Sequence, residues 1–185
     1  QYPLLIKALA DNHLTVNDVQ LFKTDGAQVA NLLATKSVDA GITWDPHVSR
    51  ALADGTATVL SSSAEIMPIK NGHYVGNGTY VRDDFMAKHP DIVQAIVSSL
   101  VQAIDLIKKD PERAIDIWTK ENDFPRPVIE YALKQKISVF DRNVVPDKAS
   151  VDAYTAFLKK SGLLKDTDNP KIETKFAEQA LKDVK

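Results

Sequence analysis

The chain has 185 residues, with 23 lysines and arginines against 25 aspartates and glutamates, which gives a formal net charge of −2 at pH 7. Such a balanced chain has no electrostatic footprint for nucleic acid or an anionic membrane. Cysteine is absent, which excludes disulfides, thiolate catalysis and cysteine-based metal sites. No uninterrupted apolar run reaches the length of a membrane span, and the chain is long enough for one or two domains with a buried core.

The first third of the chain alternates between helical and strand patterns. Helices are predicted over 3–12, 27–35 and 47–53, and strands over 19–23, 38–44 and 58–60. An αβαβαβ order is typical of a parallel sheet covered by helices, so we expect an α/β fold.

One strand-to-helix junction in this region is a candidate ligand site. The apolar run from Val38 to Trp44 predicts a buried strand, Asp45 suits a helix N-cap, and Pro46 suits the first helical position. Because ligands of open α/β sheets bind at the carboxyl ends of strands, we expect Trp44, Asp45 and Pro46 to line a binding site.

The rest of the chain is predominantly helical. One strand, with a turn or bulge around Gly76 and Asn77, is predicted over 74–81. Predicted helices follow over 83–88, from Pro90, after Pro111, from Pro127, after Asp147 and over 171–184. A single strand cannot pair its own backbone groups, and unpaired buried amides are costly. Since the chain also begins without a start methionine or signal peptide, we expect that an N-terminal part carrying the partner strands is missing.

Several segments in this order resemble the C-terminal part of type II solute-binding proteins of ABC importers, in the nitrate/sulfonate/taurine branch. They are the opening helix from Tyr2 to Leu9, the segment from Val38 to Pro46, the segment from Tyr80 to Phe85 with Lys88 to Pro90, and the run from Asp110 to Ala114. The resemblance covers essentially the whole chain.

The resemblance implies a bilobed fold of the periplasmic-binding-protein type II class. Residues 1–72 would form the second lobe, without the strand that enters it, and residues 73–185 would supply a returning strand and helices of the first lobe. The protein would capture a small anionic or zwitterionic solute by lobe closure and deliver it to a membrane permease, as a monomer and without a cofactor. It would act in the periplasm or as an extracytoplasmic lipoprotein.

Each candidate ligand residue also has a structural interpretation. Trp44 forms a wall over the ligand or covers the end of the sheet, and Asp45 is either an N-cap or a partner for an ammonium group such as that of taurine. Tyr2 would face the cleft from the first helix. Gly76 and Asn77 would lie at a hinge or in a simple turn. His47 is interpreted as a surface residue.

No motif indicates a catalytic residue, a phosphate loop or a metal site. Two alternatives to transport remain on the same architecture: a ligand-sensing module of a signalling protein, and an enzyme similar to thiamine-pyrimidine synthases, which use a cysteine-containing iron site. The sequence leaves the solute open among alkanesulfonates, taurine, nitrate, aromatic sulfonates and pyrimidines.

Overall fold

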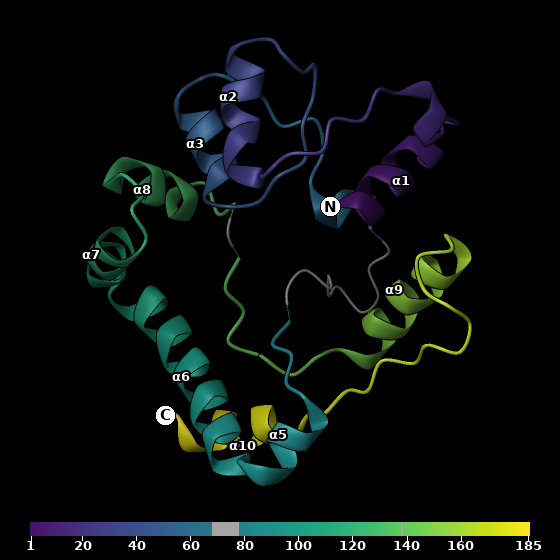
Figure 1. Cartoon of the computed structure of the whole chain (residues 1–185). Coiled ribbons are helices and arrows are strands. Elements are labelled where there is room, and N and C mark those ends of the chain that lie inside the picture. The colour runs from purple at the N-terminus through teal and green to yellow at the C-terminus, as the bar shows by residue number, and fades with distance from the viewer. Residues whose placement is uncertain (68–77, 138) are drawn as a thin grey trace. The chain divides into compact units, whose positions relative to one another are not determined.

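The computed structural model describes residues 1–67, 78–137 and 139–185 (Figure 1). These residues group into two compact units, one within 1–67 and 115–139 and the other within 68–114 and 140–185. Each unit therefore combines two stretches that are distant in sequence. The assignment of 1–72 and 73–185 to two lobes stays a prediction.

The first unit is built from short helices joined by irregular segments. Its elements are α1 (Tyr2–Asp11), η1 (Val16–Asp18), η2 (Gly26–Gln28), α2 (Val29–Ala34), α3 (His47–Ala53), α4 (Ser63–Ile66) and α8 (Arg126–Lys134). Helix α7 (Pro111–Glu121) contains residues of both units.

The core of the first unit forms where α3 packs against α8 and α2. Ile129 and Ala132 of α8 are completely buried, as is Ser49 of α3, and Ala51 of α3 is nearly so. Burying one large apolar side chain such as Ile129 contributes about 1.5–3 kcal/mol. This packing holds α3, and therefore also the turn at residues 43–46 that precedes it.

The second unit contains α5 (Asp83–Lys88), α6 (Pro90–Lys109), α9 (Lys148–Lys160) and α10 (Lys175–Asp183). Helix α6 packs along α10, and Figure 1 shows the two side by side. Val93 and Val101 of α6 are buried together with Phe176 and Ala180 of α10. The side-chain amide of Gln94 donates to the carbonyl of Phe176 over 3.1 Å, which adds a polar contact to this apolar interface.

A partly buried ion pair connects the loop before α9 to these two helices. The Arg142 guanidinium donates to Asp105 Oδ1 of α6 over 2.8 Å and to the carbonyl oxygen of Val184, just after α10, over 2.5 Å. The hydrogen bond from Arg142 lowers the pKa of Asp105 below its ordinary value of 3.8. Arg142 thus joins the loop before α9 to both helices of the core.

Helix α6 also has the length and mean hydropathy of a membrane-crossing helix. The sequence analysis found no such segment, because charged and polar residues interrupt the apolar run of α6. Its apolar positions follow the 3.6-residue period, and one side is buried against α10. A core helix of a folded domain passes the same test, but only 11% of the most apolar stretch of α6 is buried within the described residues.

Most of the predicted helices are confirmed, and several of their caps are those expected. Helix α3 has the predicted bounds, and Asp147 accepts a hydrogen bond from the Ser150 backbone N–H over 2.7 Å at the start of α9. The last helix begins at Lys175 instead of at residue 171. The four-residue helix α4 was not expected; it begins with a capping box between Ser62 and Glu65.

The strands predicted from the sequence are not found in the described part of the structure. Residues 19–23, 38–44, 58–60 and 78–81 have no strand assignment, and residues 74–77 lie outside the described residues. A strand requires a neighbour that pairs with its backbone groups, and no such ladder occurs in the described part of the chain. The apolar side chains that suggested strands are accordingly exposed: Leu21, Phe22, Val59, Leu60 and Tyr80.

Replacing Asp105 by asparagine should destabilise the second unit in a pH-dependent way. Because the folded-state pKa of Asp105 is lowered, its stabilising effect is present above the ordinary value of 3.8 and is lost as the pH falls through the folded-state pKa. Urea unfolding should therefore show a lower midpoint for Asp105→Asn at neutral pH and a shrinking difference in acid. Asp152→Asn, at an exposed pair with Lys148, is the matched control. An equal loss for Asp105→Asn at every pH would contradict this account.

Candidate functional site

The candidate site is centred on the turn from Thr43 to Pro46, which leads into α3. The carbonyl oxygen of Trp44 accepts a hydrogen bond from the Val48 backbone N–H over 3.2 Å, and that of Pro46 accepts one from Arg50 over 3.0 Å. The N-cap of α3 is Pro46 instead of the predicted Asp45, and the peptide bond before Pro46 is cis. The turn is therefore continuous with the first turn of the helix.

Asp45 performs the capping function from the residue before Pro46. Its Oδ1 accepts hydrogen bonds from the Ser49 hydroxyl over 2.6 Å and from the Ser49 backbone N–H over 3.2 Å. Since the Ser49 side chain is completely buried, these bonds satisfy a polar group that would otherwise be costly. The bonds agree with the capping interpretation of Asp45, and its contact with a ligand stays a prediction.

The indole of Trp44 lies against the backbone at Gly26. A Cβ atom built at Gly26 would lie 2.6 Å from Cη2 and 2.8 Å from Cζ3 of the Trp44 ring, so only glycine leaves room for it. The Thr43 hydroxyl donates to the carbonyl oxygen of Gly26 over 3.1 Å and joins the same two segments. Trp44 nevertheless remains 48% exposed, and it offers solvent an apolar surface beside a close backbone contact.

Two further aromatic rings, those of His47 and Phe124, form a row of contacts with Trp44. The His47 ring meets the indole edge-to-face, with centroids 5.7 Å apart at 77°. Phe124, from the loop between α7 and α8, lies 5.4 Å from the His47 ring at 57°. His47 is half-buried, so the structure differs from its interpretation as a simple surface residue.

The other predicted ligand residues are not part of this group. Tyr2 is the first residue of α1, which packs against α4, and its side chain is about half exposed. Gly76 and Asn77 lie outside the described residues. The roles of these three residues as ligand contacts stay predictions.

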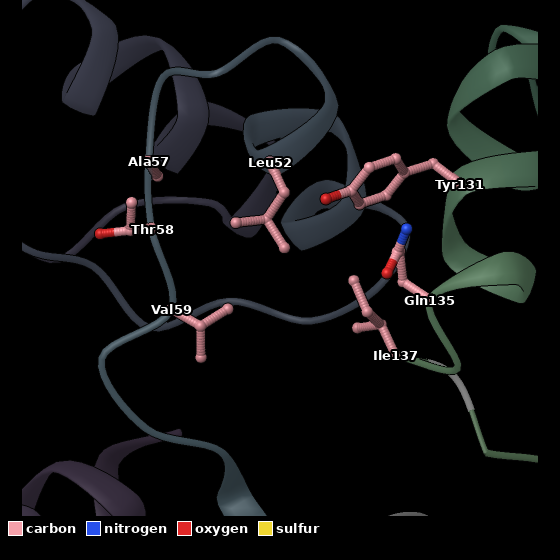
Figure 2. Close-up of a pocket in the computed structure, with 7 residues that line it drawn as sticks. All are labelled: Leu52, Ala57, Thr58, Val59, Tyr131, Gln135 and Ile137. Atoms are coloured by element: carbon pink, nitrogen blue, oxygen red, sulfur yellow. The ribbon is translucent and has the colours of Figure 1, made fainter.

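A shallow groove of about 450 Å³ lies elsewhere in the first unit, beyond the other end of α3. Figure 2 shows Leu52, Val59 and Ile137 pointing into it, with the Tyr131 ring at one side. The groove is open and has a mixed lining, in which Thr58, Tyr131 and Gln135 contribute polar side-chain groups. It is separate from the Trp44 turn. No group of three or more histidine, aspartate or glutamate side chains in the described residues is arranged to hold a metal ion.

The geometry of the turn suits binding of an organic group through apolar contact. An indole that is fixed on one side and open on the other offers a large contact area at a low cost in conformational entropy. The sequence pointed to Trp44, but not to Gly26, which lies against the indole, or to Phe124, which contacts His47. Gly26 directly follows Asp25, the N-cap of η2, and Phe124 lies in the Asn-Asp-Phe-Pro run at 122–125.

Comparison with known proteins gives one family match and several relatives that are named as binding proteins. The NMT1-like family matches residues 3–118, which is more than half of the chain and includes the Trp44 turn. A "Putative aliphatic sulfonates-binding protein" of Escherichia coli is 24% identical over 155 residues, which cover 84% of this chain and 47% of the relative. One of the same name from Bacillus subtilis is 27% identical over 117 residues, covering 63% and 34%.

A "Putative binding protein" of Brucella abortus is 26% identical over 118 residues, covering 63% of this chain and 36% of the relative. The chain thus spans less than half the length of these curated relatives. No solved structure gives a significant match.

Because the Trp44 ring lies against Gly26, a methyl group added at residue 26 should disturb the indole. Gly26→Ala should displace the indole and destabilise the first unit by about 1–3 kcal/mol, the usual cost of overpacking. The control is Gly78→Ala, where the nearest atom to an added Cβ is 3.6 Å away. Urea unfolding and Trp44 fluorescence, in a Trp118→Phe background, measure both effects. Unchanged fluorescence in Gly26→Ala would show that the indole does not lie on Gly26.

Proposed function

Because the chain belongs to the NMT1-like family, we propose that it is part of the substrate-binding component of an ABC importer. This component captures a small oxyanion-type solute by closure of two lobes. The family match, which includes the Trp44 turn, is the observation that carries the proposal. The names of the relatives, which are binding proteins and sulfonate-binding proteins, support a solute-binding role and not an enzymatic one.

In this proposal the solute is an organic sulfonate, and its carbon chain lies on the exposed surface of Trp44. An inorganic anion such as nitrate would gain little from an indole, whereas an alkyl group gains about 0.8 kcal/mol for each CH₂ that it buries. The carboxylate of Asp45 lies directly next to Trp44 in the chain and disfavours an anionic group there. The sulfonate therefore points away from Asp45, toward donors elsewhere in the complete site.

The remaining features follow from this role. The protein acts outside the cytoplasm as a monomer and presents its closed form to a membrane permease. Pro46 shapes the turn that carries Trp44, and Tyr2, Gly76 and Asn77 are further contacts at the rim of the cleft.

A thermal-shift panel on the complete natural protein tests the proposal. Ethanesulfonate, hexanesulfonate, taurine, nitrate and sulfate are compared, and binding to the native state stabilises it by about 2.7 kcal/mol at a hundred times Kd. We expect stabilisation by the alkanesulfonates, greater for the longer chain, and little from nitrate. Trp44→Ala should weaken hexanesulfonate binding about tenfold or more, equivalent to about 1.4 kcal/mol.

Trp118→Phe is the matched control, since it alters the other tryptophan and should leave the Kd unchanged. No stabilisation by any anion, together with turnover of a solute, would replace transport by an enzymatic function. Binding of nitrate in preference to the alkanesulfonates would overturn the assignment of the organic group to Trp44.

A further inference from the structure

Trp44 needs support because nearly half of its side-chain surface faces solvent. The backbone at Gly26 blocks the indole on one side, and His47 meets it edge-to-face. An aromatic side chain so exposed keeps one orientation only when neighbouring groups exclude the alternative rotamers. The contacts with His47 and Gly26 therefore both limit how far the indole can turn.

His47 is in turn held by a residue distant in sequence. Phe124 contacts the His47 ring from the loop between α7 and α8, and both rings are half-buried. The packing of α3 against α8 brings this loop to the first turn of α3. The contacts thus form a row from Phe124 through His47 to Trp44, entirely within the first unit.

The local sequence fixes the position of Phe124. Asp123 adopts a left-handed conformation with φ of 45°, which aspartate tolerates better than most residues. Pro125 disfavours a helical conformation at Phe124 and is itself the N-cap of α8. Phe124 therefore lies in a non-helical segment directly before the N-cap of α8. Phe124 lies outside the residues that the family matches.

We propose that His47 and Phe124 are positioning residues, which hold the indole of Trp44 in the orientation that receives the organic part of the solute. This inference rests on the proposed function for its ligand, but the positioning itself is a property of the unliganded protein. Removing either ring frees the indole to rotate, so affinity falls although neither residue contacts the solute.

Trp44 fluorescence tests the positioning without any ligand. The chain has two tryptophans, so a Trp118→Phe background leaves Trp44 as the single emitter. His47→Ala and Phe124→Leu should each make the indole more accessible to acrylamide and lower its anisotropy, with about a three- to tenfold change in the rotamer equilibrium for the loss of one aromatic pair. Phe124→Tyr retains the ring and should behave like the parent. Phe157→Leu removes a half-buried ring from a stacked pair with Tyr154 and is the matched control.

The double variant distinguishes a row of contacts from two separate effects. If Phe124 acts through His47, Phe124→Leu should change the fluorescence no further once His47 is alanine. Fully additive changes, or an unchanged anisotropy in Phe124→Leu with intact thermal stability, would overturn the proposal.

Solute binding gives a second and separate readout. Phe124→Leu should weaken hexanesulfonate binding about three- to tenfold in the parent and not at all in Trp44→Ala. If the parent binds no solute, the proposed function fails while the fluorescence test still decides the positioning. If Phe124→Leu weakens binding equally in Trp44→Ala, Phe124 does not act through Trp44 and the positioning role is wrong.

Discussion

The close contact between the Trp44 indole and the backbone at Gly26 is the constraint on which the candidate site depends. It exists because residue 26 has no Cβ, and because the Thr43 hydroxyl bonds the Gly26 carbonyl and holds the two segments together. Asp45 then binds Ser49 and joins the same turn to α3. The result is a partly exposed tryptophan whose two chain neighbours, Thr43 and Asp45, are both held by hydrogen bonds.

This turn is held in place because α3, which follows it, packs against α8 and α2. Ile129 and Ala132 of α8 are fully buried where α8 meets α3, and apolar burial of this kind is the dominant favourable term in folding. Exposed ion pairs such as Lys148–Asp152 add little, since solvent screens them. In the second unit the Arg142 contacts with Asp105 and Val184 are better shielded, and they connect a loop to a helix pair whose interface is otherwise apolar.

The sequence was sufficient for the helices and for the family, but not for the environment of the site. Periodicity and capping residues identify α3, α6 and α9, because both are local signals. The resemblance to nitrate/sulfonate/taurine binding proteins is confirmed by the family match. The strand at 38–44 was not found, because a strand also depends on a distant pairing partner. Phe124 was missed for the same reason: its contact with His47 joins residues far apart in the chain.

The central claim is that Trp44 contacts the organic part of the solute. Intermolecular nuclear Overhauser effects test it most directly, with tryptophan-labelled complete protein and hexanesulfonate at saturation. The account predicts cross-peaks from the methylene protons of the solute to the indole protons of Trp44 and none to those of Trp118. Bound hexanesulfonate whose methylene protons show no cross-peak to Trp44, but do show them to other side chains, would contradict it.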